Sequence, residues 1–188
     1  AADLNTVFAQ SGALFRKCAL DAAGHYAADY IEYLEEYDLT FRLYAAGYTT
    51  LHFRELMIMH QGACVENDID IQMRQLVRNS LMLWHKFLPE KTAQQQLDTV
   101  LWRYKHLARE TDTETAFDMG LEQGKQLAEH WAKRKKFKLQ PEQAIAALGI
   151  NKMRYNLELL NRNLPEHSQI VIIGTGELLH ILIDDLQK

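Results

Sequence analysis

The chain has 188 residues, of which 47% are hydrophobic and 24% are charged, and its formal net charge is -4. This apolar content is sufficient for the core of one ordinary domain or two small ones, so we expect a globular protein. The negative charge gives no overall attraction to nucleic acid or anionic lipid, so any such contact would need a local basic patch.

The first part of the chain is expected to alternate short strands and helices. β-branched and aromatic residues favour strands, whereas apolar residues at helical spacing favour helices. The predicted order is one or two short strands over residues 6–17, a short helix over 17–24 closed by Gly24, a loop over 25–33, a helix from about Glu35 to Gly47, and a strand over 49–60 that ends at His60.

The rest of the chain is expected to be helical almost to its end. Amphipathic spacing predicts helices over 69–88, 92–110 and 113–137, and two shorter helices follow between Pro141 and Pro165. The final "IVIIGTGELL" predicts a buried strand, a glycine turn and a helix. We therefore expect an α/β, helix-rich chain in three parts: residues 1–90, a helical region over 91–167, and the start of a truncated Rossmann-like unit over 168–188.

Cysteine usage and hydropathy indicate a cytoplasmic protein. Cys18 and Cys64 are too few for a disulfide framework and belong to no zinc-binding grouping. No apolar run reaches the roughly 20 residues that span a bilayer, and the start does not resemble a signal peptide. Because the chain begins without Met and ends after one βα unit, we expect it to be a segment of a longer protein.

Three carboxylates gather in the stretch "YLEEYDLTFRLYAAGY", and helix physics alone explains them. Asp38 and Arg42 lie four residues apart, which favours a helical ion pair worth about 0.2–0.5 kcal/mol. Glu35 and Glu36 lie at the predicted helix start, where the helix dipole stabilises negative charge. On these grounds all three would be ordinary solvated residues.

The wider pattern around these acids suggests a more specific function. It consists of a glycine, a basic pair and a glycine-ended helix, then an acidic helix start, then a strand that ends in histidine. The residues that carry it are Gly12, Arg16, Lys17, Leu20, Gly24, His25, Tyr26, Glu35, Glu36, Asp38, Leu39, Arg42, Gly47, Tyr48 and His60. In this order the chain resembles the acceptor half of inverting family-two glycosyltransferases of the GT-A fold. "RQLVRNSLMLWHKFLP" is similar to the helix that follows in many members, with Arg78 and Asn79 in the place of a common pair.

The resemblance implies a role for several of the matched residues. It implies that Glu36, where the family usually has Asp, is the general base that deprotonates the acceptor hydroxyl, with Glu35 as a substitute. Acceptor binding is implied for Arg16, Tyr26, Asp38 and Arg42, although Asp38 is also explained by its pair with Arg42. His60 is implied as a ligand of a divalent metal, Mn²⁺ or Mg²⁺, and a packed, hydrogen-bonded histidine is the alternative.

The donor half of the family has no counterpart in this sequence. That half contains a D-x-D-type motif before the acceptor half, whereas "DIDI" at 68–71 follows it, so we do not assign it that role. We expect a nucleotide-sugar donor and a glycan or lipid-linked acceptor for the whole protein, and we expect this segment alone to be inactive.

Two further patterns allow other interpretations. The segment 141–162 has the outline of a helix-turn-helix, with Lys152, Arg154, Asn156 and Arg162 as candidate contacts, although nucleic acid is the less favoured partner. The basic run "KRKKFK" from Lys133 to Lys138 suggests peripheral contact with the inner face of a membrane, or a solvated helix end. A non-catalytic binding or regulatory module is therefore the alternative function.

Overall fold

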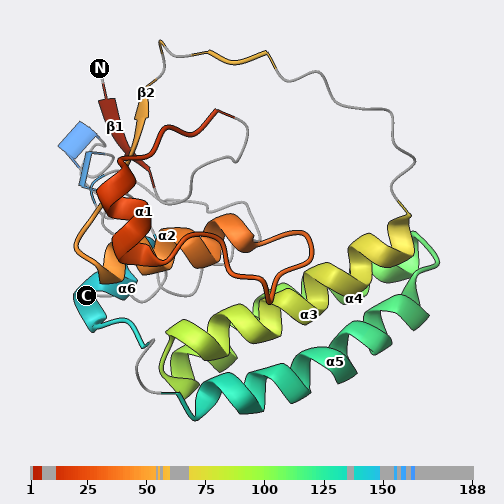
Figure 1. The fold of residues 1–188 in the computed structure, drawn as a ribbon. Helices are drawn as coiled ribbons and strands as arrows, with labels where there is room; N and C mark the ends of the chain where they lie inside the picture. The colour runs from red at the N-terminus through yellow and green to blue at the C-terminus, as the bar shows by residue number, and fades with distance from the viewer. Residues whose placement is uncertain are drawn as a thin grey trace.

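The computed structural model describes residues 2–5, 12–53, 55, 57–59, 68–134, 138–148, 155, 158–159 and 162–163. Within them the chain forms β1 (Ala2–Asn5), α1 (Lys17–Ala23), α2 (Glu35–Ala45), β2 (Thr50–Phe53), α3 (Ile69–Phe87), α4 (Glu90–Glu110), α5 (Glu114–Ala132) and α6 (Pro141–Ala147). The described part is helix-rich, as predicted (Figure 1). His60, Lys152, Arg154, Asn156 and the predicted unit 168–188 lie outside the described residues.

Three long helices, α3, α4 and α5, form the larger part of the fold, and α5 lies along α3 (Figure 1). Two glycines of α5 permit this close approach. A Cβ at Gly120 would come within 2.7 Å of the Arg74 carbonyl oxygen, and one at Gly124 within 2.9 Å of the Leu81 Cβ. At these contacts α3 and α5 run in the same chain direction. The chain therefore runs back through α4 before α5 begins.

Local signals explain where α3 begins and ends. The Asp68 side chain caps its start by accepting hydrogen bonds from the backbone N–H groups of Asp70 and Ile71, at 3.0 and 3.4 Å. The helix ends at Phe87, and Pro89 then precedes the first residue of α4. The predicted helix over 69–88 is therefore confirmed to within one residue.

Helices α1 and α2 form a smaller layer over the long helices. Gly24 closes α1 in the left-handed conformation, at φ 86°, as predicted. Leu39 and Leu43 of α2 pack with Ala19 and Ala23 of α1 in a cluster separate from the main core. This packing fixes the direction of α2, the helix that carries the predicted acids.

Helix α6 holds the other end of α2. The Gln143 amide donates hydrogen bonds to the carbonyl oxygens of Tyr44 and Ala45, at 3.3 and 3.2 Å. The same side chain accepts a bond from the backbone N–H of Gln140, which caps the start of α6. The predicted helix start at Pro141 is confirmed.

The strand predictions need correction. β1 pairs with β2 in antiparallel register, with Ala2 opposite Phe53 and Asn5 opposite Thr50. β1 thus lies before the predicted stretch 6–17. Within that stretch residues 13–16 are not in a strand and Lys17 is already helical, while residues 6–11 lie outside the described residues. Among the described residues of the predicted 49–60, β2 covers Thr50–Phe53. Pairing across the chain, which local propensity does not encode, decides where these short strands form.

Two further findings concern the predicted helix over 113–137 and the predicted boundary at residue 90. The helix expected over 113–137 ends at Ala132, so the basic run is not a helix end throughout. One hydrophobic core cluster extends from Tyr30 to Ala147 and crosses the proposed boundary between 1–90 and 91–167. No described helix has the length and apolar composition required to cross a membrane.

Candidate active site at the start of α2

Glu35 and Glu36 form the first turn of α2, directly after two residues in an uncommon backbone conformation. Tyr33 and Leu34 have φ values of 65° and 69°, and Leu34 is the N-cap of the helix. Left-handed backbone at such residues costs about 1–3 kcal/mol each and persists only where the surrounding structure enforces it. This turn therefore sets where α2 begins, and so where Glu35 and Glu36 lie.

Arg78 and Asn79 of α3 enforce this turn. The Asn79 amide donates to the carbonyl oxygens of Glu32 and Tyr33, at 2.5 and 2.8 Å. Arg78 donates to the Asn79 side-chain oxygen at 2.5 Å and to the Asp29 carbonyl oxygen at 3.0 Å. Asn79 is fully buried. The pair that the resemblance singled out thus binds the loop that leads into the acids.

The two acids are partly buried, and the pKa of Glu36 is shifted. Burial raises the pKa of the Glu36 carboxyl above 4.5, its own backbone N–H partly opposes the shift, and the adjacent Glu35 raises the pKa further. A carboxylate with a raised pKa is a stronger base, and the most effective general base has a pKa near the working pH. The raised pKa of Glu36 is therefore one of the properties expected of a general base.

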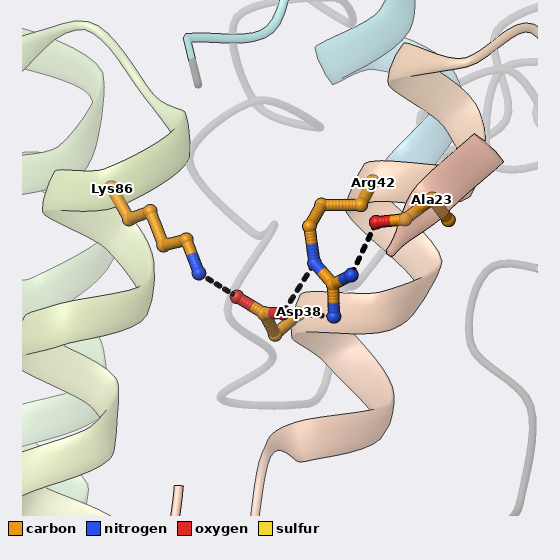
Figure 2. A network of polar contacts seen from close by, with 4 residues as sticks. All are labelled: Ala23, Asp38, Arg42 and Lys86. Atoms are coloured by element: carbon orange, nitrogen blue, oxygen red, sulfur yellow. Dashed lines mark hydrogen bonds and ion pairs between the residues drawn. The ribbon is translucent and has the colours of Figure 1, made fainter. Parts of the chain in front are cut away.

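Asp38 and Arg42 form the predicted helical ion pair, which lies in the interior. Arg42 Nε donates to Asp38 Oδ2 at 2.7 Å, and its guanidinium also donates to the carbonyl oxygen of Ala23 at the end of α1 (Figure 2). Asp38 is fully buried, and the Arg42 side chain is 11% exposed. Both side chains have internal partners, so their contribution at this site is to hold α2 in place.

Lys86 of α3 completes this network, and sequence reasoning missed it. Its Nζ lies 2.5 Å from Asp38 Oδ1, and its side chain is only 3% exposed (Figure 2). The ammonium also lies 4.5 Å from the centre of the Trp131 ring and 5.8 Å from that of Tyr30. Aromatic faces attract a desolvated cation, so these rings add to the contact that Lys86 makes with the Asp38 carboxylate. The available signal was a lysine at helical spacing from buried Met82 and Leu83.

Tyr30 lies next to the same network. Burial raises the pKa of its hydroxyl well above 10.0, and the neighbouring Asp38 carboxylate raises it further. Tyr30 is therefore neutral at physiological pH, and its ring packs against Lys86.

The remaining predicted residues lie further from the acids along the chain. Arg16 is the exposed N-cap of α1, and Tyr26, 43% exposed, follows that helix. Direct acceptor contact by these residues stays a prediction. Within the described residues no three His, Cys, Asp or Glu side chains are grouped so that they could hold a metal ion, and His60 lies outside those residues.

The basic run is partly used inside the protein. Lys138 donates to the carbonyl oxygens of His85 and Leu88, at 2.5 and 2.6 Å, and so caps the end of α3. The Arg134 guanidinium lies 4.9 Å from the centre of the Trp131 ring, and Lys133 is exposed. Of the helix-turn-helix candidates only Arg162 is described; it is exposed and lies 3.6 Å from Glu158.

Comparison with known proteins gives no relative: no family, no curated protein and no solved structure matches this chain.

Proposed function

We propose that this chain is the acceptor-side part of an inverting glycosyltransferase of the GT-A fold. Glu36 removes the proton from an acceptor hydroxyl as its oxygen forms a bond to the anomeric carbon of the donor sugar. The bond from that carbon to the nucleoside diphosphate breaks on the opposite side, so the configuration inverts. The donor is a nucleotide-sugar, and the acceptor is a glycan, including a lipid-linked one.

The observation that supports this proposal most directly is the setting of Glu36. The carboxylate lies at a helix start, is partly buried, and has a pKa raised by that burial. These are properties of a group that accepts a proton during a reaction. Glu35, in the same turn, is the second candidate for this role.

Other predicted residues take supporting roles in the proposal. Arg16 and Tyr26 are exposed and remain candidates for contact with the acceptor. Asp38 and Arg42 act on the acceptor only indirectly, because their side chains are bound to each other and to the protein interior.

A divalent metal, Mn²⁺ or Mg²⁺, is proposed for the whole protein, where it would offset the charge of the leaving diphosphate. The described residues contain no cluster of metal ligands. His60 stays the proposed ligand from this chain. The proposed location is the cytoplasm, with membrane contact through the exposed part of the basic run, Lys133 and Arg134.

The proposal is tested by sugar transfer from a panel of nucleotide-sugars with Mn²⁺, using the whole protein that contains this chain and a donor-binding half. Glu36→Gln is expected to abolish transfer while donor binding is retained, and Glu36→Asp, the residue usual in the family, is expected to keep activity. Glu122→Gln makes the same chemical change on an exposed face of α5 and is the matched control. Normal transfer by Glu36→Gln would refute the assigned base. No transfer and no donor binding by any form would favour a binding or regulatory module.

A further inference from the structure

We propose that one face of α3, which carries Asn79 and Lys86, is a positioning device for Glu36. It fixes the chain on both sides of this residue, through the loop before it and the helical turn after it. That Glu36 is a base depends on the proposed function, whereas its positioning by α3 does not.

The loop before Glu36 is bound by Asn79. Its amide donates to two successive carbonyl oxygens, those of Glu32 and Tyr33, which are the last residues before the N-cap Leu34. The Asn79 oxygen in turn accepts a bond from Arg78, which fixes the orientation of the amide. Every polar atom of the Asn79 side chain is therefore used to bind the loop or to orient the group that binds it.

The helical turn after Glu36 is bound by Lys86. Its ammonium pairs with Asp38, two residues beyond Glu36, and both side chains are almost completely buried. Arg42 pairs with the other oxygen of the same carboxylate and with the Ala23 carbonyl of α1. The first turn of α2 is therefore held from α3 and from α1 at once.

The spacing of the two positioning residues follows from helix geometry. Asn79 and Lys86 are seven residues apart, close to two turns of an α-helix, so they lie on one face of α3. Both are polar residues in a stretch of α3 that is otherwise mainly apolar and buried. A helix that needed only to pack would have apolar residues at these positions.

The backbone conformation of the loop gives this device a function beyond packing. Tyr33 and Leu34 adopt left-handed conformations that L residues avoid, and Asn79 donates to the Glu32 and Tyr33 carbonyl oxygens at this point of the loop. Without these bonds the loop would relax and α2 would begin at a different place. A displacement of about 1 Å at a reacting group costs on the order of 100-fold in rate.

The test uses the 188-residue chain and follows the titration of the Glu36 carboxyl by NMR. In Asn79→Ala the loop is expected to relax, Glu36 becomes more exposed, and its pKa falls back toward 4.5. Val100→Ala is the matched control, because it removes volume from the buried face of α4, a helix that takes no part in the hydrogen bonds between Asn79 and the loop. It is expected to keep the raised pKa of Glu36. An unchanged Glu36 pKa in a folded Asn79→Ala chain would overturn the proposal.

Arg78→Met provides a milder variant if Asn79→Ala does not fold. Arg78 is only partly buried, so its loss removes the bonds to Asn79 and to Asp29 without opening the core. A fall in the Glu36 pKa supports the proposal, and an unchanged value refutes it.

In the whole protein, Asn79→Ala is expected to lower kcat by about 100-fold with little change in KM for the donor. Absence of transfer in the unmodified protein would refute the proposed reaction, while the NMR titration would still decide whether α3 positions Glu36.

Discussion

Lys86 and Asp38, which are 48 residues apart in the chain, form a buried ion pair between α3 and α2. Arg42 shares the same carboxylate, so two cations and one anion lie together in the interior. The Lys86 ammonium also lies 4.5 Å from the centre of the Trp131 ring, which stabilises a desolvated cation. Loss of the Asp38 carboxylate therefore removes two ion pairs, whereas loss of Lys86 removes its pair with Asp38 and leaves that with Arg42.

Asp38→Asn is expected to destabilise the chain more than Lys86→Met. Removing the carboxylate takes away the acid that Lys86 and Arg42 both contact in the interior, which costs about 3–5 kcal/mol of unfolding free energy. Removing Lys86 leaves Asp38 paired with Arg42, so the loss is smaller. Unfolding in urea, followed by circular dichroism, measures both.

The control for this comparison is the pair between Lys17 and Asp21, whose side chains are 89% and 47% exposed. Lys17→Met is expected to change the unfolding free energy by less than about 1 kcal/mol, since exposed pairs contribute little. If Asp38→Asn cost no more than Lys17→Met, the buried network would not be the link between α2 and α3.

Most helices could be predicted because residues at or near each end determine where the helix begins or stops. Gly24 ends α1 through its left-handed backbone, Pro141 starts α6, and the apolar spacing of α3 gives its length. The strands could not be placed in this way, because β1 pairs with β2, a segment far from it in the sequence. The end of α5 was predicted five residues too late for a similar reason. The helix ends at Ala132, and Lys138 caps the end of α3, which is distant in the sequence.

In the candidate site, too, contacts between near residues could be predicted and contacts between distant residues could not. The pair of Asp38 and Arg42 follows from a spacing of four residues and was predicted. The contact of Lys86 with Asp38 and those of Asn79 with the loop span 46–48 residues, and no local pattern contains them. Arg78 and Asn79 were singled out only by family resemblance, which gave their positions without their partners.

Gly120→Ala is expected to destabilise the packing of α5 on α3. The new Cβ would lie 2.7 Å from the carbonyl oxygen of Arg74, a backbone atom that cannot move without shifting α3. Alanine is the better helix former by about 0.8–1 kcal/mol, so a net loss reports the clash directly. We expect a net loss of about 1–3 kcal/mol in urea unfolding. Gln123→Ala, at an exposed position of α5, is the control and is expected to stay within about 0.5 kcal/mol. A neutral or stabilising Gly120→Ala would contradict the close approach of the two helices.

Glu36→Gln is expected to change the pH dependence of stability. Because burial raises the pKa of Glu36 in the folded chain, the folded state binds the proton more tightly than the unfolded state does. The stability of the unmodified chain therefore falls as the pH rises from 4.5 to the higher folded pKa. Glutamine does not titrate, so the variant gains stability relative to the unmodified chain across this window and keeps the gain above it.

Urea unfolding at several pH values, from below 4.5 to neutral, measures this difference. The gain is expected to be below about 1 kcal/mol, because Glu36 is partly exposed and water screens its charge. Glu122→Gln, on the exposed face of α5, corrects for the loss of one negative charge. A difference that shrinks with rising pH would show that the Glu36 pKa is not raised.

Lys138→Met is expected to raise the pKa of His85. Burial lowers the pKa of this imidazole below 6.5, the Lys138 ammonium lowers it further, and Glu90 acts in the opposite direction. Removing the ammonium leaves the burial effect, opposed by Glu90, so the pKa of the imidazole lies closer to 6.5 in the variant. Because the folded pKa of His85 is depressed, the stability it contributes is present above 6.5 and is lost as the pH falls toward the folded value. The variant should lose less stability in this window, although the two carbonyl groups left without their donor lower its unfolding free energy by about 1–3 kcal/mol at neutral pH.

NMR titration of the His85 ring measures the shift, with Lys105→Met on the exposed face of α4 as the control. A His85 pKa that stays the same in Lys138→Met would mean that the ammonium does not lie at the end of α3, and the capping of α3 by the basic run would then be wrong.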